Sequence, residues 1–224
     1  FLLSKVLQLK SRCDLEIYAF ALMPNHVHLV LRRMHDPIAG FMAALLTTFA
    51  RHFNRKYGLV GHVFQGRYRC LLCEDETYLL RLVRYVHRNP VRAGLSSGVE
   101  FGWSSYSAYL GRGPVGLVAP ETVLRHFGKE LLAARAAFRA YHESEMAAAD
   151  TKEDFMPRRG VFLGGETFEE RGRRRASRSG ESPPPDRPLL DAILRDSLAA
   201  SRLRVATVEV RGPSRRLAAA LVRS

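Results

Sequence analysis

Apolar residues recur at two different spacings along the first part of the sequence. Over residues 1–12 they recur every three to four positions, as on one side of a helix. Two extended apolar runs follow at residues 16–23 and 26–33, and the Pro24-Asn25 pair between them is a turn signal. The pattern therefore predicts a helix followed by a β-hairpin.

The helical spacing returns over residues 38–57, and a further extended run covers residues 63–73. After that run, residues 79–86 again show the apolar spacing of a helix. Asn89-Pro90 is expected to interrupt this helix, because the residue before a proline is pushed out of the helical region. Helices and strands in this order, with a hairpin at the centre, favour an α+β fold with an antiparallel sheet over a parallel one.

Composition divides the sequence into four parts. Glycine and proline residues near 111–116 end a first unit, residues 1–113. Residues 114–159 are predicted to form an Ala-rich helical extension. The basic, Pro-rich stretch 160–188 is a linker by composition. A small helical module is predicted over residues 189–224.

The composition indicates a globular protein with a polyanionic partner. Of its 224 residues 46% are hydrophobic, no apolar run has the length of a membrane span, and the first residues turn polar too soon for a signal peptide. We therefore expect a cytoplasmic protein. Because the first residue is Phe1 and not a methionine, we also expect the true start to precede it. The formal net charge of +13 favours nucleic acid as the partner, with a membrane surface as the alternative.

The cysteines do not point to a disulfide framework or to a metal site. There are only three, which fits a reducing compartment. Cys70 and Cys73 have the spacing of half a zinc site, but no second half accompanies them. They also fall in a predicted strand, where residues three apart point to opposite faces. We expect no metal between them.

His26 and His28 are the first residues that suggest chemistry. Side chains two apart on a strand share a face, so both imidazoles point the same way while Val27 points to the other side. Two such histidines can bind a divalent metal together with a third group from elsewhere. The alternative is a pair of hydrogen-bonded histidines on a polar sheet face, and the spacing alone does not decide between them.

Tyr85 and Asn89 form a second group. They lie four apart, so on a helix they are neighbours on one face. A tyrosine hydroxyl can attack phosphorus and leave a covalent intermediate, provided that a nearby cation favours the phenolate. The amide oxygen of Asn89 is a hard ligand, suited to Mg²⁺ or Mn²⁺. The alternative for Tyr85 is a half-buried aromatic residue with no role in catalysis.

Three ordered motifs carry a resemblance to a known family. They are Ala21 to Val30 (ALMPNHVHLV), Gly61 to Arg67 (GHVFQGR) and Tyr85 to Leu95 (YVHRNPVRAGL), and Trp103-Ser104-Ser105-Tyr106 follows them. Together they closely resemble the REP-associated tyrosine transposases, within the single-tyrosine HUH transposases of insertion sequences. The resemblance covers roughly residues 10–111, far more than one short pattern.

The resemblance implies a role for each of these groups. It makes His26 and His28 the metal ligands, Tyr85 the catalytic nucleophile and Asn89 the third, polar ligand. It implies a ferredoxin-like antiparallel sheet with helices on one face, and a strand before the first helix that does not occur here. His62 and His87 also match family positions, without a known role. Residues 189–224 resemble the beginning of the C-terminal helix-turn-helix that some longer relatives carry, which implies a partial module of this kind.

The activity implied is cleavage of single-stranded DNA through a 5′-phosphotyrosine, followed by rejoining, with Mg²⁺ or Mn²⁺. Single-stranded or hairpin DNA is the expected partner, and a homodimer is left open. Plausible contacts to the DNA backbone are Arg51, Arg55, Lys56, Arg67, Arg69 and Arg88. The first alternative is a decayed or domesticated relative that binds DNA without cutting it. The second, a zinc hydrolase using the two histidines and a cysteine, has no well-placed third ligand.

Overall fold

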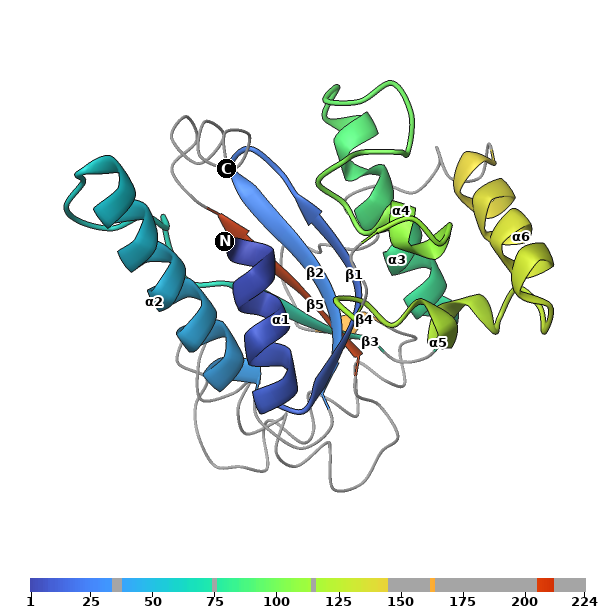
Figure 1. Ribbon diagram of the computed structural model, residues 1–224, viewed down its shortest axis with the longest axis horizontal. Helices are drawn as coiled ribbons and strands as arrows, with labels where there is room; N and C mark the ends of the chain where they lie inside the picture. Colours follow the sequence, from blue (N-terminus) through green and yellow to red (C-terminus); the bar gives the residue numbers. More distant parts are fainter. Residues whose placement is uncertain (34–37, 74–75, 114–115, 145–161, 164–204, 212–224) are drawn as a thin grey trace.

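The computed structural model describes residues 1–33, 38–73, 76–113, 116–144, 162–163 and 205–211. The chain contains both helices and strands, and the strands combine into one sheet with helices around it (Figure 1). The predicted α+β class is therefore confirmed. No helix in the described part of the chain is long and apolar enough to cross a membrane.

The sheet has five strands in the order β1-β2-β5-β3-β4. Strands β1 (Leu15–Leu22) and β2 (His26–Arg33) form the predicted antiparallel hairpin. Strand β5 (Val205–Arg211) is antiparallel to both β2 and β3 (Arg69–Cys73), and the short β4 (Phe162–Leu163) is parallel to β3. The sheet is thus antiparallel except at the β4 edge.

Strand β5 corrects the prediction for the last part of the sequence. Residues 205–211 form a strand in the middle of the sheet, so the helical module predicted over 189–224 is wrong at these positions. The rest of that module, and most of the 160–188 linker, lie outside the described residues. The resemblance implied a strand before the first helix. In this chain the central place between β2 and β3 is taken by residues from far along the sequence.

Helices cover both faces of the sheet, not one as expected. One layer holds α1 (Leu2–Arg12) and α2 (Ile38–Tyr57). The opposite layer holds α3 (Glu76–Arg92), α5 (Pro120–Leu124) and α6 (Leu131–Glu143), with the short α4 (Tyr106–Tyr109) beside them (Figure 1). The helices predicted in the 114–159 extension are therefore present, up to residue 144.

The sequence of β1 explains why both faces are covered. Nearly every residue of β1 is buried, with no polar side facing solvent. Ile17, Phe20 and Leu22 pack towards α1 and α2, while Tyr18 and Ala19 pack towards α3. A register shift between Ile17 and Ala19 lets two neighbouring residues share the α3 face, as a β-bulge does. Each face therefore carries apolar area that needs a helix layer.

Two predicted boundaries move. Of the extended run 63–73, only residues 69–73 are strand, because Val63 and Phe64 pack as a loop against α2. Helix α3 is not interrupted at Asn89-Pro90 but continues to Arg92. Pro90 lies in its last turn, and Gly94, just past the helix end, has the positive φ of 68° that is typical of a helix C-cap.

The segment 103–105 covers the outer edge of β1. The Leu22 amide donates to the Trp103 carbonyl at 2.9 Å, and the Ser105 amide donates to the Phe20 carbonyl at 3.0 Å. An unpaired strand edge is open to pairing with other chains. The Trp103-Ser104-Ser105-Tyr106 motif thus protects one edge of the sheet.

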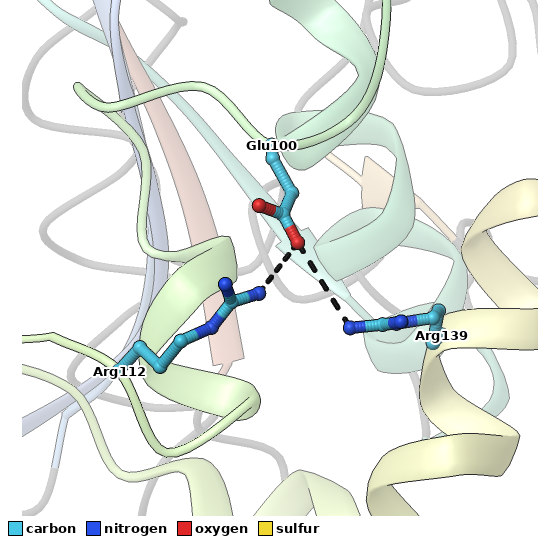
Figure 2. A network of polar contacts seen from close by, with 3 residues as sticks. All are labelled: Glu100, Arg112 and Arg139. Carbon is cyan, nitrogen blue, oxygen red and sulfur yellow. Dashed lines mark hydrogen bonds and ion pairs between the residues drawn. The ribbon is translucent and has the colours of Figure 1, made fainter.

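A surface ion-pair network ties the loop before α4 to α6. The Glu100 carboxylate points at the guanidinium groups of Arg112, 2.5 Å away, and Arg139, 3.9 Å away (Figure 2). All three side chains are about half exposed, and exposed pairs of this kind contribute little to stability. The firm attachment of α6 must therefore come from its buried side.

That buried side contains the Ser105–His87–His142 hydrogen-bond series. The His87 ring lies 2.7 Å from the Ser105 hydroxyl through Nε2 and 3.1 Å from His142 Nε2 through Nδ1. His142 Nδ1 donates to the Phe138 carbonyl at 2.9 Å. All three side chains are almost completely buried. The series joins α3, α6 and the segment that covers β1.

Burial is the largest influence on the pKa of His142 and lowers it to about 3. The hydrogen bond to the Phe138 carbonyl opposes this shift, while the charges of Arg84 and Arg88 on α3 reinforce it. An unfolded histidine binds a proton near pH 6.5. Below that pH the unfolded chain therefore holds more protons than the folded one, and folding stability falls as the pH drops from 6.5 towards 3.

We predict that His142→Leu flattens this pH dependence. Wild-type protein should lose free energy of unfolding between pH 7 and pH 5, with a His142 contribution of up to ~1.4 kcal/mol per pH unit below 6.5. The variant should be less stable at pH 7 but should lose less on acidification. Urea titrations at several pH values measure both. The exposed His126→Leu is the control and should keep the wild-type slope; parallel curves for His142→Leu would contradict the assignment.

Candidate active site

The two histidines of β2 lie on the face of the sheet that α3 covers. Val27 and Leu29 point into the opposite layer with α1 and α2, so the alternation of the strand sends His26 and His28 towards α3. Their rings are 4.7 Å apart between centroids and nearly perpendicular. The predicted shared face is confirmed, and His28 is buried whereas His26 is partly open to solvent.

Asn25 fixes the orientation of the His26 ring. The Asn25 amide oxygen lies 2.6 Å from His26 Nδ1, and an amide oxygen can only accept, so Nδ1 carries the proton. The lone pair of His26 is then on Nε2. Metal-binding histidines commonly hold their second ring nitrogen in this way. From the sequence, Asn25 was predicted to form a turn and to belong to a motif, and its contact with His26 was not predicted.

Helix α3 brings Tyr85 to the histidines. The Tyr85 ring lies 6.0 Å from the His28 ring between centroids, edge to face. Only 3% of Tyr85 is exposed, more buried than the half-buried aromatic considered as the alternative. The Arg92 guanidinium lies 5.2 Å above the Tyr85 ring. Arg92, in the last turn of α3, is a cation beside the hydroxyl-bearing ring that the sequence reading did not single out.

Asn89 lies one turn after Tyr85, as predicted. Its side-chain nitrogen donates to the Tyr85 carbonyl at 2.9 Å. This contact uses the donor end of the amide and leaves Oδ1 as the end suited to a cation. It also couples the position of Asn89 to the backbone that carries Tyr85.

The residues fit a divalent cation in chemistry. Two imidazoles and an amide oxygen are a mixed nitrogen and oxygen set acceptable to Mn²⁺ and Mg²⁺. Within the described residues no three histidine, cysteine, aspartate or glutamate side chains are grouped to hold a metal ion. A cation at His26 and His28 would therefore need Asn89, water or a phosphate oxygen to complete its shell.

Cys70 and Cys73 lie apart from this site. Both are buried, Cys70 in the layer of α1 and α2 and Cys73 in the layer of α3. They point to opposite faces of β3, as the strand spacing predicted.

The predicted DNA contacts fall on different surfaces. Arg51, Arg55 and Lys56 are exposed on α2, in the layer opposite the histidines. Arg69 is exposed on β3. It pairs with Glu209 on β5, and Glu209 pairs with His28 on β2. Residues paired across strands share a face, so Arg69 lies on the same face as His28. Arg67 is exposed in the loop before β3. The structure therefore brings Arg69 to the histidine face and leaves the α2 cations behind the sheet.

Arg88 has a structural contact. Its Nη1 donates to the His142 carbonyl at 2.7 Å, so its guanidinium belongs to the α3–α6 contact. His142, treated as incidental from the sequence, is the buried partner of His87. His62 is exposed and distant in sequence from both groups. The motif position of His87 is the one sequence signal for the contact between His87 and His142, because nothing in the sequence of residues 131–143 marks His142 as the partner.

Comparison with known proteins finds a family similar to part of the chain. No curated protein and no solved structure matches the chain. Residues 2–89, which run from α1 through most of α3, match the family model described as "Transposase IS200 like". The matched range includes His26, His28, Tyr85 and Asn89. This part of the chain is therefore similar to the IS200-like transposases.

Proposed function

We propose that the protein is a single-stranded DNA transposase that cuts and rejoins DNA through a covalent bond to Tyr85. The observation that carries the proposal is the contact between Tyr85 on α3 and His28 on β2, with His26 beside it. A tyrosine and two histidines from distant parts of the sequence meet there, as a nucleophile and two metal ligands would. The finer placement among REP-associated transposases rests on the sequence motifs alone.

The proposed reaction is an exchange of phosphodiester bonds. The Tyr85 hydroxyl oxygen attacks a DNA phosphorus atom, a bond from phosphorus to tyrosine forms and the bond to the 3′-oxygen breaks. The 3′-oxygen takes up a proton and leaves as a 3′-hydroxyl, while the 5′-phosphate stays on Tyr85. Attack by the 3′-hydroxyl of another strand reverses the step. One ester replaces another each time, so no nucleotide cofactor is consumed.

The surrounding side chains would support the reaction. Arg92, 5.2 Å from the Tyr85 ring, is a cation that can meet the phosphate. His26, oriented by Asn25, together with His28 and Asn89, would hold a divalent cation. When bound, Mg²⁺ or Mn²⁺ would polarise the scissile phosphate and reduce its negative charge.

The expected DNA is single-stranded or a hairpin with a single-stranded tip. Tyr85 is an almost completely buried residue of α3, so a phosphate of a flexible single strand would approach it more readily than one in a closed duplex. Arg69, on the histidine face, and Arg67, in the loop before β3, would contact the DNA backbone. Arg51, Arg55 and Lys56 on α2 would contact DNA that passes behind the sheet. Phosphate contacts of this kind weaken steeply as salt rises.

We predict that Tyr85→Phe abolishes the covalent adduct and changes DNA affinity little, because only the attacking oxygen is lost. Labelled single-stranded hairpin DNA is incubated with Mg²⁺, and adducts that survive denaturation are counted. Tyr78→Phe, on the same helix, is the matched control and should form adduct at the wild-type yield. An equal yield in Tyr85→Phe would refute the nucleophile.

The same experiment separates the non-catalytic alternative. A chain that binds hairpin DNA tightly but forms no adduct in Mg²⁺ or Mn²⁺ would be a DNA-binding relative. Equal affinity for single strand, duplex and heparin across a salt titration would instead indicate a non-specific polyanion binder.

We predict that Asn25→Ala weakens Mn²⁺ binding about 10-fold or more, since it removes the group that orients His26. His28→Ala should weaken it further and stop cleavage, because one of few protein ligands is lost. Calorimetric Mn²⁺ titrations measure both, and the exposed His62→Ala is the control. Cleavage that persists in EDTA would show that the histidines serve another purpose, and tight Zn²⁺ binding would favour the hydrolase alternative.

A further inference from the structure

Helix α3 is held from two directions. Tyr85 points to the histidines of β2, while His87, two residues later and about 200° around the helix, points to α6 and the segment 103–105. His87 is completely buried, and its ring also packs edge-on against Tyr106 and Tyr109. A residue fixed this firmly, so close to the nucleophile, limits how far α3 can rotate or slide.

The hydrogen bonds of the Ser105–His87–His142 series can be assigned direction from one end to the other. The Phe138 carbonyl can only accept, so His142 Nδ1 donates to it and His142 Nε2 is an acceptor. His87 Nδ1 therefore donates to His142 Nε2, and His87 Nε2 accepts from the Ser105 hydroxyl. The Ser105 oxygen in turn accepts from the Phe20 amide at 2.9 Å. With both rings neutral, each donor has its own acceptor.

This series reaches back to the sheet that carries the metal-binding histidines. Phe20 is on β1, where its register partner on β2 is Leu29, the residue next to His28. The series therefore fixes α3 relative to the same hairpin that holds His28. On the other side it depends on α6, and Arg88 adds a second bond from α3 to the His142 carbonyl. Helix α6 lies beyond the range that matches the transposase family model.

We propose that Ser105, His87 and His142 are positioning residues that set the place of Tyr85 against His26 and His28, and that α6 is a working part of the catalytic unit. The proposal rests on the proposed function of Tyr85. It gives a role to three motif or extension residues that do not touch the reacting atoms. A shift of about 1 Å in such a group can lower a rate about 100-fold.

The test compares two substitutions at one position. His142→Leu removes the acceptor for His87 Nδ1, whereas His142→Gln offers a side-chain oxygen there. Val123→Ala is the matched control, because Val123 is completely buried in the same cluster but makes no part of the series. For each protein, the single-turnover rate of adduct formation is measured at saturating hairpin DNA, with the dissociation constant for the same DNA.

We expect His142→Leu to slow adduct formation about 10- to 100-fold with DNA affinity within about twofold of wild type. His142→Gln should recover most of the rate, and Val123→Ala should keep it despite lost stability. Equal rates for the leucine and glutamine variants, or rates that follow unfolding free energy across all three, would overturn the proposal.

A second readout does not depend on catalysis. In proton–nitrogen NMR spectra the wild-type protein should show slowly exchanging Nδ1 protons on both His87 and His142. In proton–proton nuclear Overhauser spectra it should show a cross-peak between the Tyr85 and His28 rings. His142→Leu should lose the ring cross-peak and His142→Gln should retain it. If the wild type forms no adduct but shows this pattern, the transposase proposal fails while the positioning stands. A ring cross-peak unchanged in His142→Leu would overturn the positioning itself.

Discussion

The alternation of side chains along β2 is the constraint on which the rest of the structure depends. Val27, Leu29 and Leu31 must face one apolar layer, so His26 and His28 can only face the other. A slip of one residue against β1 would bury both imidazoles among α1 and α2 and leave three apolar side chains towards Tyr85. The free energy gained by burying these three apolar side chains therefore also determines on which face of the sheet His26 and His28 lie.

Helix α3 brings Tyr85 against the sheet face that carries His26 and His28. Its sequence alternates residues for two different partners, with Tyr85 towards the histidines and His87 and Arg88 towards α6. Asn89 and Asn25 have similar tasks, since each uses one end of its amide to hold a neighbour. Under the proposed function, these neutral amides would orient the groups around a cation without adding charge to a site that takes a phosphate.

Much of this arrangement follows from local pattern. The hairpin, α1, α2 and the shared face of His26 and His28 were predicted correctly because they depend on spacing within short segments. The strand over residues 63–68 was wrong because Val63 and Phe64 find burial against α2 without pairing. The break at Pro90 was wrong because the Ala93 and Leu95 amides still donate to the Asn89 and Pro90 carbonyls, so the backbone keeps its turn past the proline.

Other features could not be read from the sequence. Two helix layers follow from the burial of β1 on both sides, which a run of apolar residues does not distinguish from burial on one. His142 looked incidental because its partner lies more than one element away. Arg92 and Arg88 sit in one motif, yet only the three-dimensional path of α3 sends the first to Tyr85 and the second to α6.

The origin of β5 has a consequence for biosynthesis. The strand beside His26 and His28 is made from residues 205–211, so the ribosome completes the hairpin long before it completes the hairpin's neighbour. Until residues 205–211 are made, the β2 edge that they cover lacks this partner, and an unpaired strand edge can bind other nascent strands. Pairing at such sequence separation is also slow. The sheet that carries His26 and His28 is therefore completed late, and the time before its completion is the period in which the chain is most open to aggregation.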